Sequence, residues 1–204
     1  MRTVLPLLLL LSVCLFATFP AAQEKAPSAK RKDPQSEYEP RSKPGEGQKF
    51  LQKFVGDWEV AKTFHIRSGD PVRQKGDCRQ TMIHGGRFLQ SDFTFHGDAK
   101  TTGTGLIGFE PATGLFTSVW IDSRSTRMSF RQGQEKFDGQ QIVLCSRVLG
   151  DDGKKGRVSR TVTRLEDDGR RIVHRQYTAG AGGRERLVME LVLTKKDKEP
   201  SEGR

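Results

Sequence analysis

The feature that most constrains this 204-residue chain is a run of about ten β-strand patterns with only short turns between them. Gly and Asp clusters such as Asp151-Asp152-Gly153 and Asp167-Asp168-Gly169 supply the turn chemistry of tight hairpins. No connection is long enough for a crossover helix, so consecutive strands should pair antiparallel. The expected strands span residues 58–66, 72–83, 87–96, 102–110, 115–122, 125–132, 140–148, 157–165, 170–178 and 186–194.

A short helical pattern precedes the first strand. Phe50, Leu51 and Phe54 give it an apolar face, Gly56 can end it, and Trp58 then opens the strand. The sequence therefore predicts an all-β fold, an antiparallel up-and-down barrel of about ten strands with a short N-terminal helical plug. Eight strands give an interior that side chains just fill or that holds one small ligand. Ten strands make it wider, so a ligand or water should occupy it unless the barrel flattens.

Several strands show the period of two that separates the two faces of a sheet. In the second strand Gln80 shares a face with apolar neighbours, and in the sixth Met128 and Phe130 lie opposite Arg127 and Arg131. In the eighth, valines and arginines share one face while mainly hydroxyl residues share the other. That pattern does not say which face of the eighth strand points inward.

The N-terminal segment has the composition of a targeting signal. Residues 1–22 hold a short basic start, an almost continuous apolar run and the small residues Pro20-Ala21-Ala22. This pattern predicts a secretory signal peptide, with a retained N-terminal anchor as the alternative. We therefore expect an exported protein that is periplasmic, envelope-associated or secreted, with no membrane span once the signal is removed.

The remaining sequence divides into three parts. Residues 23–48 hold four prolines and mixed charges, and predict a disordered linker. Residues 49–195 form the barrel domain, and residues 196–204 form a charged, disordered tail.

The charge balance is basic, with 35 Lys and Arg against 25 Asp and Glu, a formal net charge of +10. The basic residues are spread through the strands, as on a solvated outer face. Such a surface attracts anionic polymers in general, and it does not predict specific nucleic-acid binding.

Two cysteines lie within the expected barrel. An exported protein would reach an oxidising compartment, where Cys78 and Cys145 could pair. They fall on the second and seventh expected strands, nearly opposite in a meander, whereas a disulfide needs Cα atoms within about 7 Å. Two buried thiols are the favoured reading, and a disulfide is the alternative.

A family resemblance rests on several motifs in the barrel region. About residues 50–194 resemble domain-of-unknown-function family 1579, a calycin-like (lipocalin- and nitrobindin-type) barrel family common in exported bacterial proteins. The motifs are Phe54-Val55-Gly56-Asp57-Trp58, His84-Gly85-Gly86-Arg87-Phe88-Leu89, Gly103-Thr104-Gly105 with Gly108-Phe109, and Val119-Trp120-Ile121-Asp122. The resemblance implies that Phe54, Gly56 and Trp58 close one end of the barrel. It implies a fold and carries no established activity.

Departures from better-known calycins narrow the expectations further. Fatty-acid-binding proteins insert a helix pair after the first strand, where only a tight hairpin fits here, and the Thr-Asp-Tyr-like motif of lipocalins is missing. Nitrobindin-like proteins hold haem through a histidine on the closing strand, and the closing strand here, Arg186 to Thr194, has none. Haem of that type is disfavoured, and we expect no cofactor.

Four residues are the predicted ligand contacts: Gln80, Trp120, Met128 and His174. They fit the general plan of an apolar pocket with a few placed polar groups. His174 has an ordinary core or surface position as its alternative. Asp122 follows Trp120 at the strand end, where it either caps the turn or stands at the barrel mouth as a polar handle.

The sequence shows no nucleophile elbow, phosphate loop or paired-carboxylate signature, and its four histidines form no cluster at metal-ligand spacing. We therefore expect no enzyme and no metal site. The favoured function is binding of a small, largely apolar ligand in the interior. The alternative is a structural or interaction module of the cell envelope, using its basic surface on an anionic polymer or partner protein.

Overall fold

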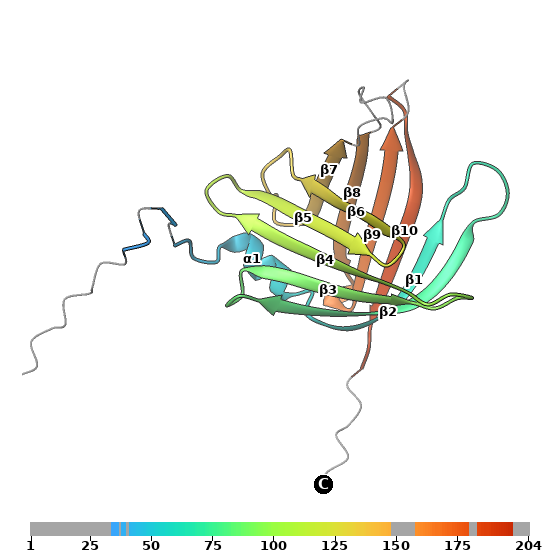
Figure 1. Cartoon of the computed structure of the whole chain (residues 1–204), viewed down its shortest axis with the longest axis horizontal. Helices are drawn as coiled ribbons and strands as arrows, with labels where there is room; N and C mark the ends of the chain where they lie inside the picture. The colour runs from blue at the N-terminus through green and yellow to red at the C-terminus, as the bar shows by residue number, and fades with distance from the viewer. Residues whose placement is uncertain (1–33, 37, 40, 148–157, 180–182, 198–204) are drawn as a thin grey trace, which may run out of the picture. The chain divides into compact units, whose positions relative to one another are not determined.

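The computed structural model describes residues 34–36, 38–39, 41–147, 158–179 and 183–197, and shows a closed antiparallel β-barrel (Figure 1). Its ten strands confirm the predicted fold class, and each lies within a few residues of its expected range. The strands are β1 (Gly56–Phe64), β2 (Val72–Ile83), β3 (Phe88–Phe95), β4 (Thr101–Glu110), β5 (Leu115–Asp122), β6 (Ser125–Gln132), β7 (Gln141–Arg147), β8 (Val158–Glu166), β9 (Arg171–Ala179) and β10 (Glu185–Lys195).

Each strand pairs with the next along the chain, and β10 returns to pair with β1. The closing pairs run from Trp58–Lys195 to Phe64–Met189. The contact between β6 and β7 is much weaker, because their described lengths share a single paired position, Gln132–Cys145. Among the described residues, positions 125–131 of β6 therefore have paired partners on β5 only.

The helix α1 (Glu46–Gln52) lies against β3 and β4 at one end of the barrel (Figure 1). Its Gln48 side chain is buried, accepting a hydrogen bond from Gly45 N at 2.7 Å and donating one to the Phe109 carbonyl at 2.7 Å. Gly47 allows the close approach, since a Cβ there would lie 2.2 Å from Cγ of Phe109. The helix begins inside the range 23–48 that was expected to be linker.

Aromatic rings fill the end of the barrel that α1 covers. Phe50 packs against Phe54 with centroids 5.3 Å apart and against Phe137 at 4.9 Å. Trp58 is 0% exposed and donates its indole N–H to the Phe54 carbonyl at 3.0 Å. Gly56 between them has φ of 147°, a conformation that favours glycine. The run from Phe54 to Trp58 thus belongs to the closed end, in the place that the resemblance implied.

Both barrel cysteines are free thiols. Cys78 lies on β2 and Cys145 on β7, two strands that are on opposite sides of the barrel. Cys78 is fully buried, and burial raises the pKa of its thiol to about 12. Cys145 is only part-buried.

The predicted flanking segments are mostly outside the described residues, including all of the expected signal peptide. At the other end, Lys196 and Asp197 of the expected tail pair with Asp77 and Arg170, each at 2.6 Å. No helix in the described part of the chain is both long and apolar enough to cross a membrane.

Candidate functional site: the barrel cavity

A cavity of about 520 Å³ occupies the barrel interior. Phe54 lines it beside the end of the barrel that α1 covers. The cavity extends to the other end, where it is lined by Phe64 at the end of β1 and by Arg124 and Ser125 at the hairpin between β5 and β6. Its size lies within the range of about 300–1,000 Å³ typical of small-molecule sites. The wide interior that ten strands predict is therefore present, and it is neither flattened nor filled by side chains.

One side of the cavity is apolar and aromatic. It is formed by β3, β4 and β5, where Phe93 packs edge-on against Trp120 with centroids 5.6 Å apart and stacks beside Phe95 at 5.6 Å. Leu89 and Ile107 continue this surface toward the closed end. We call these five residues the aromatic wall; it can bury an apolar molecule without leaving polar groups unpaired.

Five polar residues line the cavity from β6, β8 and β9. Arg131 of β6, Thr161 and Thr163 of β8, and His174 and Gln176 of β9 all line the cavity, and we call them the polar wall. The hydroxyl face of β8, which the sequence pattern left unassigned, points inward. Its arginine face points outward, where Arg160 pairs with Glu185 at 2.6 Å.

His174 is held in the polar wall by Thr163, whose hydroxyl lies 2.7 Å from the imidazole Nδ1. Burial, and secondarily the positive charge of Arg131, lower the pKa of His174 to about 4. The imidazole is therefore neutral near pH 7.

Arg131 and Gln80 each present an unpartnered polar atom. The Nε of Arg131 and the Oε1 of Gln80 are buried and make no hydrogen bond within the described structure. Burial lowers the pKa of the Arg131 guanidinium, although arginine remains charged in proteins. Unpaired polar atoms inside a protein are costly, so each marks a position where a ligand atom would be stabilised.

A further polar group lies at the open end. Trp120 donates its indole N–H to Asp122 at 2.9 Å, while the other carboxylate oxygen accepts the Arg124 backbone N–H at 2.9 Å. Both alternatives for Asp122 are thus realised, because it caps the turn and also lines the cavity. Lys62 lies over the Phe64 and Phe95 rings, 4.6 and 4.1 Å from their centroids, and burial lowers its pKa.

The structure brings together three of the four predicted ligand contacts: Gln80, Trp120 and His174 line the same cavity. Met128 is the exception and corrects that prediction. Its side chain is 66% exposed and is not part of the cavity lining. The alternation in β6 is present, but its polar side, with Arg131, faces inward, while Met128 and Phe130 face outward.

Sequence reasoning missed Arg131 and the two threonines because it assigned apolar residues to the interior. A usable signal was the register across the β5–β6 hairpin. Trp120 pairs with Ser129, and residues two apart on a strand share a face. Once Trp120 is placed inward, Arg131 must be inward too.

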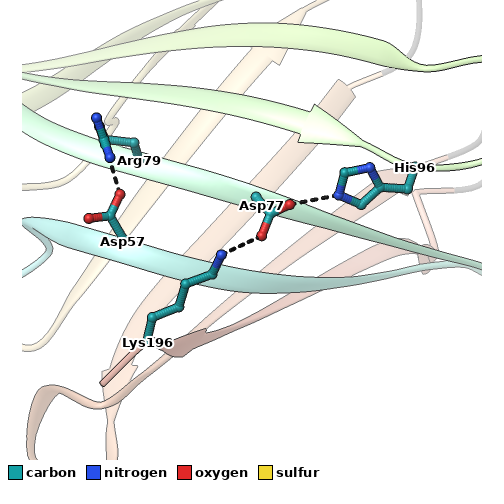
Figure 2. A network of polar contacts seen from close by, with 5 residues as sticks. All are labelled: Asp57, Asp77, Arg79, His96 and Lys196. Atoms are coloured by element: carbon teal, nitrogen blue, oxygen red, sulfur yellow. Dashed lines mark hydrogen bonds and ion pairs between the residues drawn. The ribbon is translucent and has the colours of Figure 1, made fainter. Parts of the chain in front are cut away.

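A second polar cluster lies on the outer face of β1 and β2 (Figure 2). Asp77 accepts from His96 and from Lys196, each at 2.6 Å, and Asp57 pairs with Arg79 at 2.8 Å. These side chains are 41–72% exposed and do not line the cavity. Among the described residues, no three His, Cys, Asp or Glu side chains are grouped so as to hold a metal ion.

Comparison with known proteins agrees with this architecture. A family model described as "Protein of unknown function (DUF1579)" matches residues 43–195. The crystal structure of Rv2717c from M. tuberculosis is similar in fold, with a TM-score of 0.55 and 16% identity over 76% of this chain and 100% of that one. None of the curated proteins matches this sequence.

Proposed function

This chain belongs to the family of proteins of unknown function DUF1579, and we propose that it binds a small, largely apolar molecule inside its barrel. The observation that carries the proposal is the cavity of about 520 Å³ with its aromatic wall. A closed barrel with side chains filling its interior would be more stable, since unfilled space forfeits packing contacts. A binding role accounts for the retained space.

The contrast between the two ends supports a site with one entrance. The end under α1 is packed with aromatic rings, while the cavity reaches the hairpin between β5 and β6 at the other. A ligand entering there would meet Lys62, Asp122 and Arg124 first and then the aromatic wall.

The test uses N-phenylnaphthylamine, a neutral apolar dye that fluoresces when it leaves water. Ile107→Trp would fill part of the cavity, and Leu106→Trp adds the same ring to the outer face of the same strand, where Leu106 is 38% exposed. We expect saturable binding to the wild type and to Leu106→Trp, and a loss of about tenfold or more in Ile107→Trp. Circular dichroism would confirm that both variants fold.

Dye binding that is equal in the two variants would contradict the proposal. If that binding also disappeared in high salt, it would favour the alternative in which the basic outer surface binds an anionic polymer or partner. Failure of the dye to bind the wild type would count against an apolar site.

We further propose that the protein acts after export, on the basis of the apolar N-terminal segment and its small-residue end. The intact mass of protein recovered from the medium or envelope of its own host would test this. Recovery of the protein in the cytoplasm of that host, with residues 1–22 intact, would contradict it.

A further inference from the structure

The arginines of neighbouring strands have opposite environments. On the outer faces of β8 and β9, Arg160 pairs with Glu185 through two hydrogen bonds of 2.8 and 2.6 Å, and Arg175 pairs with Glu190 at 2.7 Å. Arg131 faces the interior, its Nε is buried without a partner, and no carboxylate of the described residues forms an ion pair with it. The chain thus neutralises two half-buried arginines of the outer face and leaves the one in the cavity unpaired.

The other charges of the cavity do not offset Arg131. Of the described residues that line it, Asp122 is the one acid, and its oxygens already accept from Trp120 and from the Arg124 backbone. Lys62 and Arg124 add positive charge at the open end. His174, facing Arg131 from β9, supplies a neutral ring. The interior therefore carries uncompensated positive charge.

An uncompensated charge in a partly dehydrated site costs free energy, and a bound counter-charge recovers it. A guanidinium is suited to this because it can donate two parallel N–H bonds to one carboxylate or similar oxyanion. The aromatic wall, which begins on the neighbouring strand β5, offers no such partner and suits an apolar body instead.

Building on the function proposed above, we propose that the ligand is an amphipathic anion. Its carboxylate or similar oxyanion binds the Arg131 guanidinium, and its apolar body packs against the aromatic wall. A donor group on that body would reach the unpaired Oε1 of Gln80 on β2, across the barrel from β6.

The test compares two probes of equal chain length, decanoate and decanol, by calorimetry. Arg131→Met removes the charge and keeps an apolar side chain of similar length. Arg73→Met makes the same change on β2, where Arg73 is exposed and does not line the cavity. We expect Arg131→Met to weaken decanoate binding by about 10- to 100-fold, the usual worth of a charge-assisted hydrogen-bonded contact. Decanol binding should change by less than about threefold.

Three further measurements support the comparison. Arg131→Lys should retain part of the decanoate affinity, because it keeps the charge and loses the paired donors. Decanoate should raise the thermal midpoint of the wild type and of Arg73→Met, and should not raise that of Arg131→Met. The ligand-free Arg131→Met protein should be at least as stable as the wild type, since it no longer buries an unpaired charge.

Each contrary outcome has its own meaning. Decanoate binding that is unchanged in Arg131→Met, or weakened equally in Arg73→Met, would overturn the anion proposal while leaving an apolar site intact. Acetate binding as tightly as decanoate would overturn the need for an apolar body. Failure of both decyl probes and of the neutral dye to bind the wild type would instead count against the proposed function itself.

Discussion

The two tryptophans of this barrel sit in contrasting places. Trp58 at the helix end is 0% exposed within the hydrophobic core and donates to a backbone carbonyl. Trp120 lines the cavity and donates to the Asp122 carboxylate near the open end. The same side chain thus serves packing in one place and lines an open cavity in the other. The difference lies in whether protein atoms fill the space beside the ring.

The largest expected effect comes from removing the packed ring. Trp58→Ala should lower the free energy of unfolding by about 3–5 kcal/mol, because it leaves a large cavity in a dense region. Trp120→Ala should cost only about 1–2 kcal/mol, since its ring already borders open space and buries less apolar surface. Urea unfolding of both variants measures the difference. Equal costs would mean that the two ends do not differ in packing as the structure indicates.

The cavity lining around Trp120 also shows how much of the fold and of the site can be predicted from the sequence. The ten strands and their turns were predictable because turn residues and strand alternation are local signals. Gln80, Trp120 and His174, which the sequence offers as candidate ligand contacts, line the cavity. Met128 was misplaced, because a period of two separates two faces without saying which is inside. In a barrel with a cavity, polar residues can face inward, as Arg131 and Thr163 do.

The start of the folded domain shows a second limit of prediction from sequence. The range 23–48 was expected to be linker for its prolines and charges, yet α1 begins at Glu46. Gln48 stabilises the first turn of α1, because its side chain donates a hydrogen bond to the Phe109 carbonyl on β4. Such a long-range hydrogen bond leaves no periodic trace in the sequence.

The next prediction concerns His174 in the polar wall. Its folded-state pKa of about 4 lies below the ordinary value of 6.5. Between these values the unfolded chain binds a proton that the folded chain does not, so stability falls as pH falls from about 6.5 to about 4. The loss should approach about 3 kcal/mol. Above pH 6.5 both states are neutral and the term vanishes.

His174→Gln removes this term while keeping a neutral polar side chain. Urea unfolding at pH 7 and pH 4.5 should show a drop in wild-type stability that exceeds the drop in the variant by about 2–3 kcal/mol. Because the other titrating groups are common to both proteins, the difference isolates His174. An equal drop in both would mean that water in the cavity solvates the imidazole well enough to leave its pKa normal.

The smallest effect is expected on the outer face of β2, where Lys196 and His96 both contact Asp77 (Figure 2). Their hydrogen bonds lower the pKa of the Asp77 carboxyl, and Lys196 has its own pKa raised in return. Both side chains of the Lys196–Asp77 pair are more than 40% exposed, so solvent screens the attraction. A double-mutant cycle of Lys196→Ala and Asp77→Asn should give a coupling of at most about 1 kcal/mol, and it should decrease with salt. A coupling as large as the cost of Trp58→Ala would show that surface pairing at the end of β10, rather than aromatic packing beneath it, holds that end of the barrel closed.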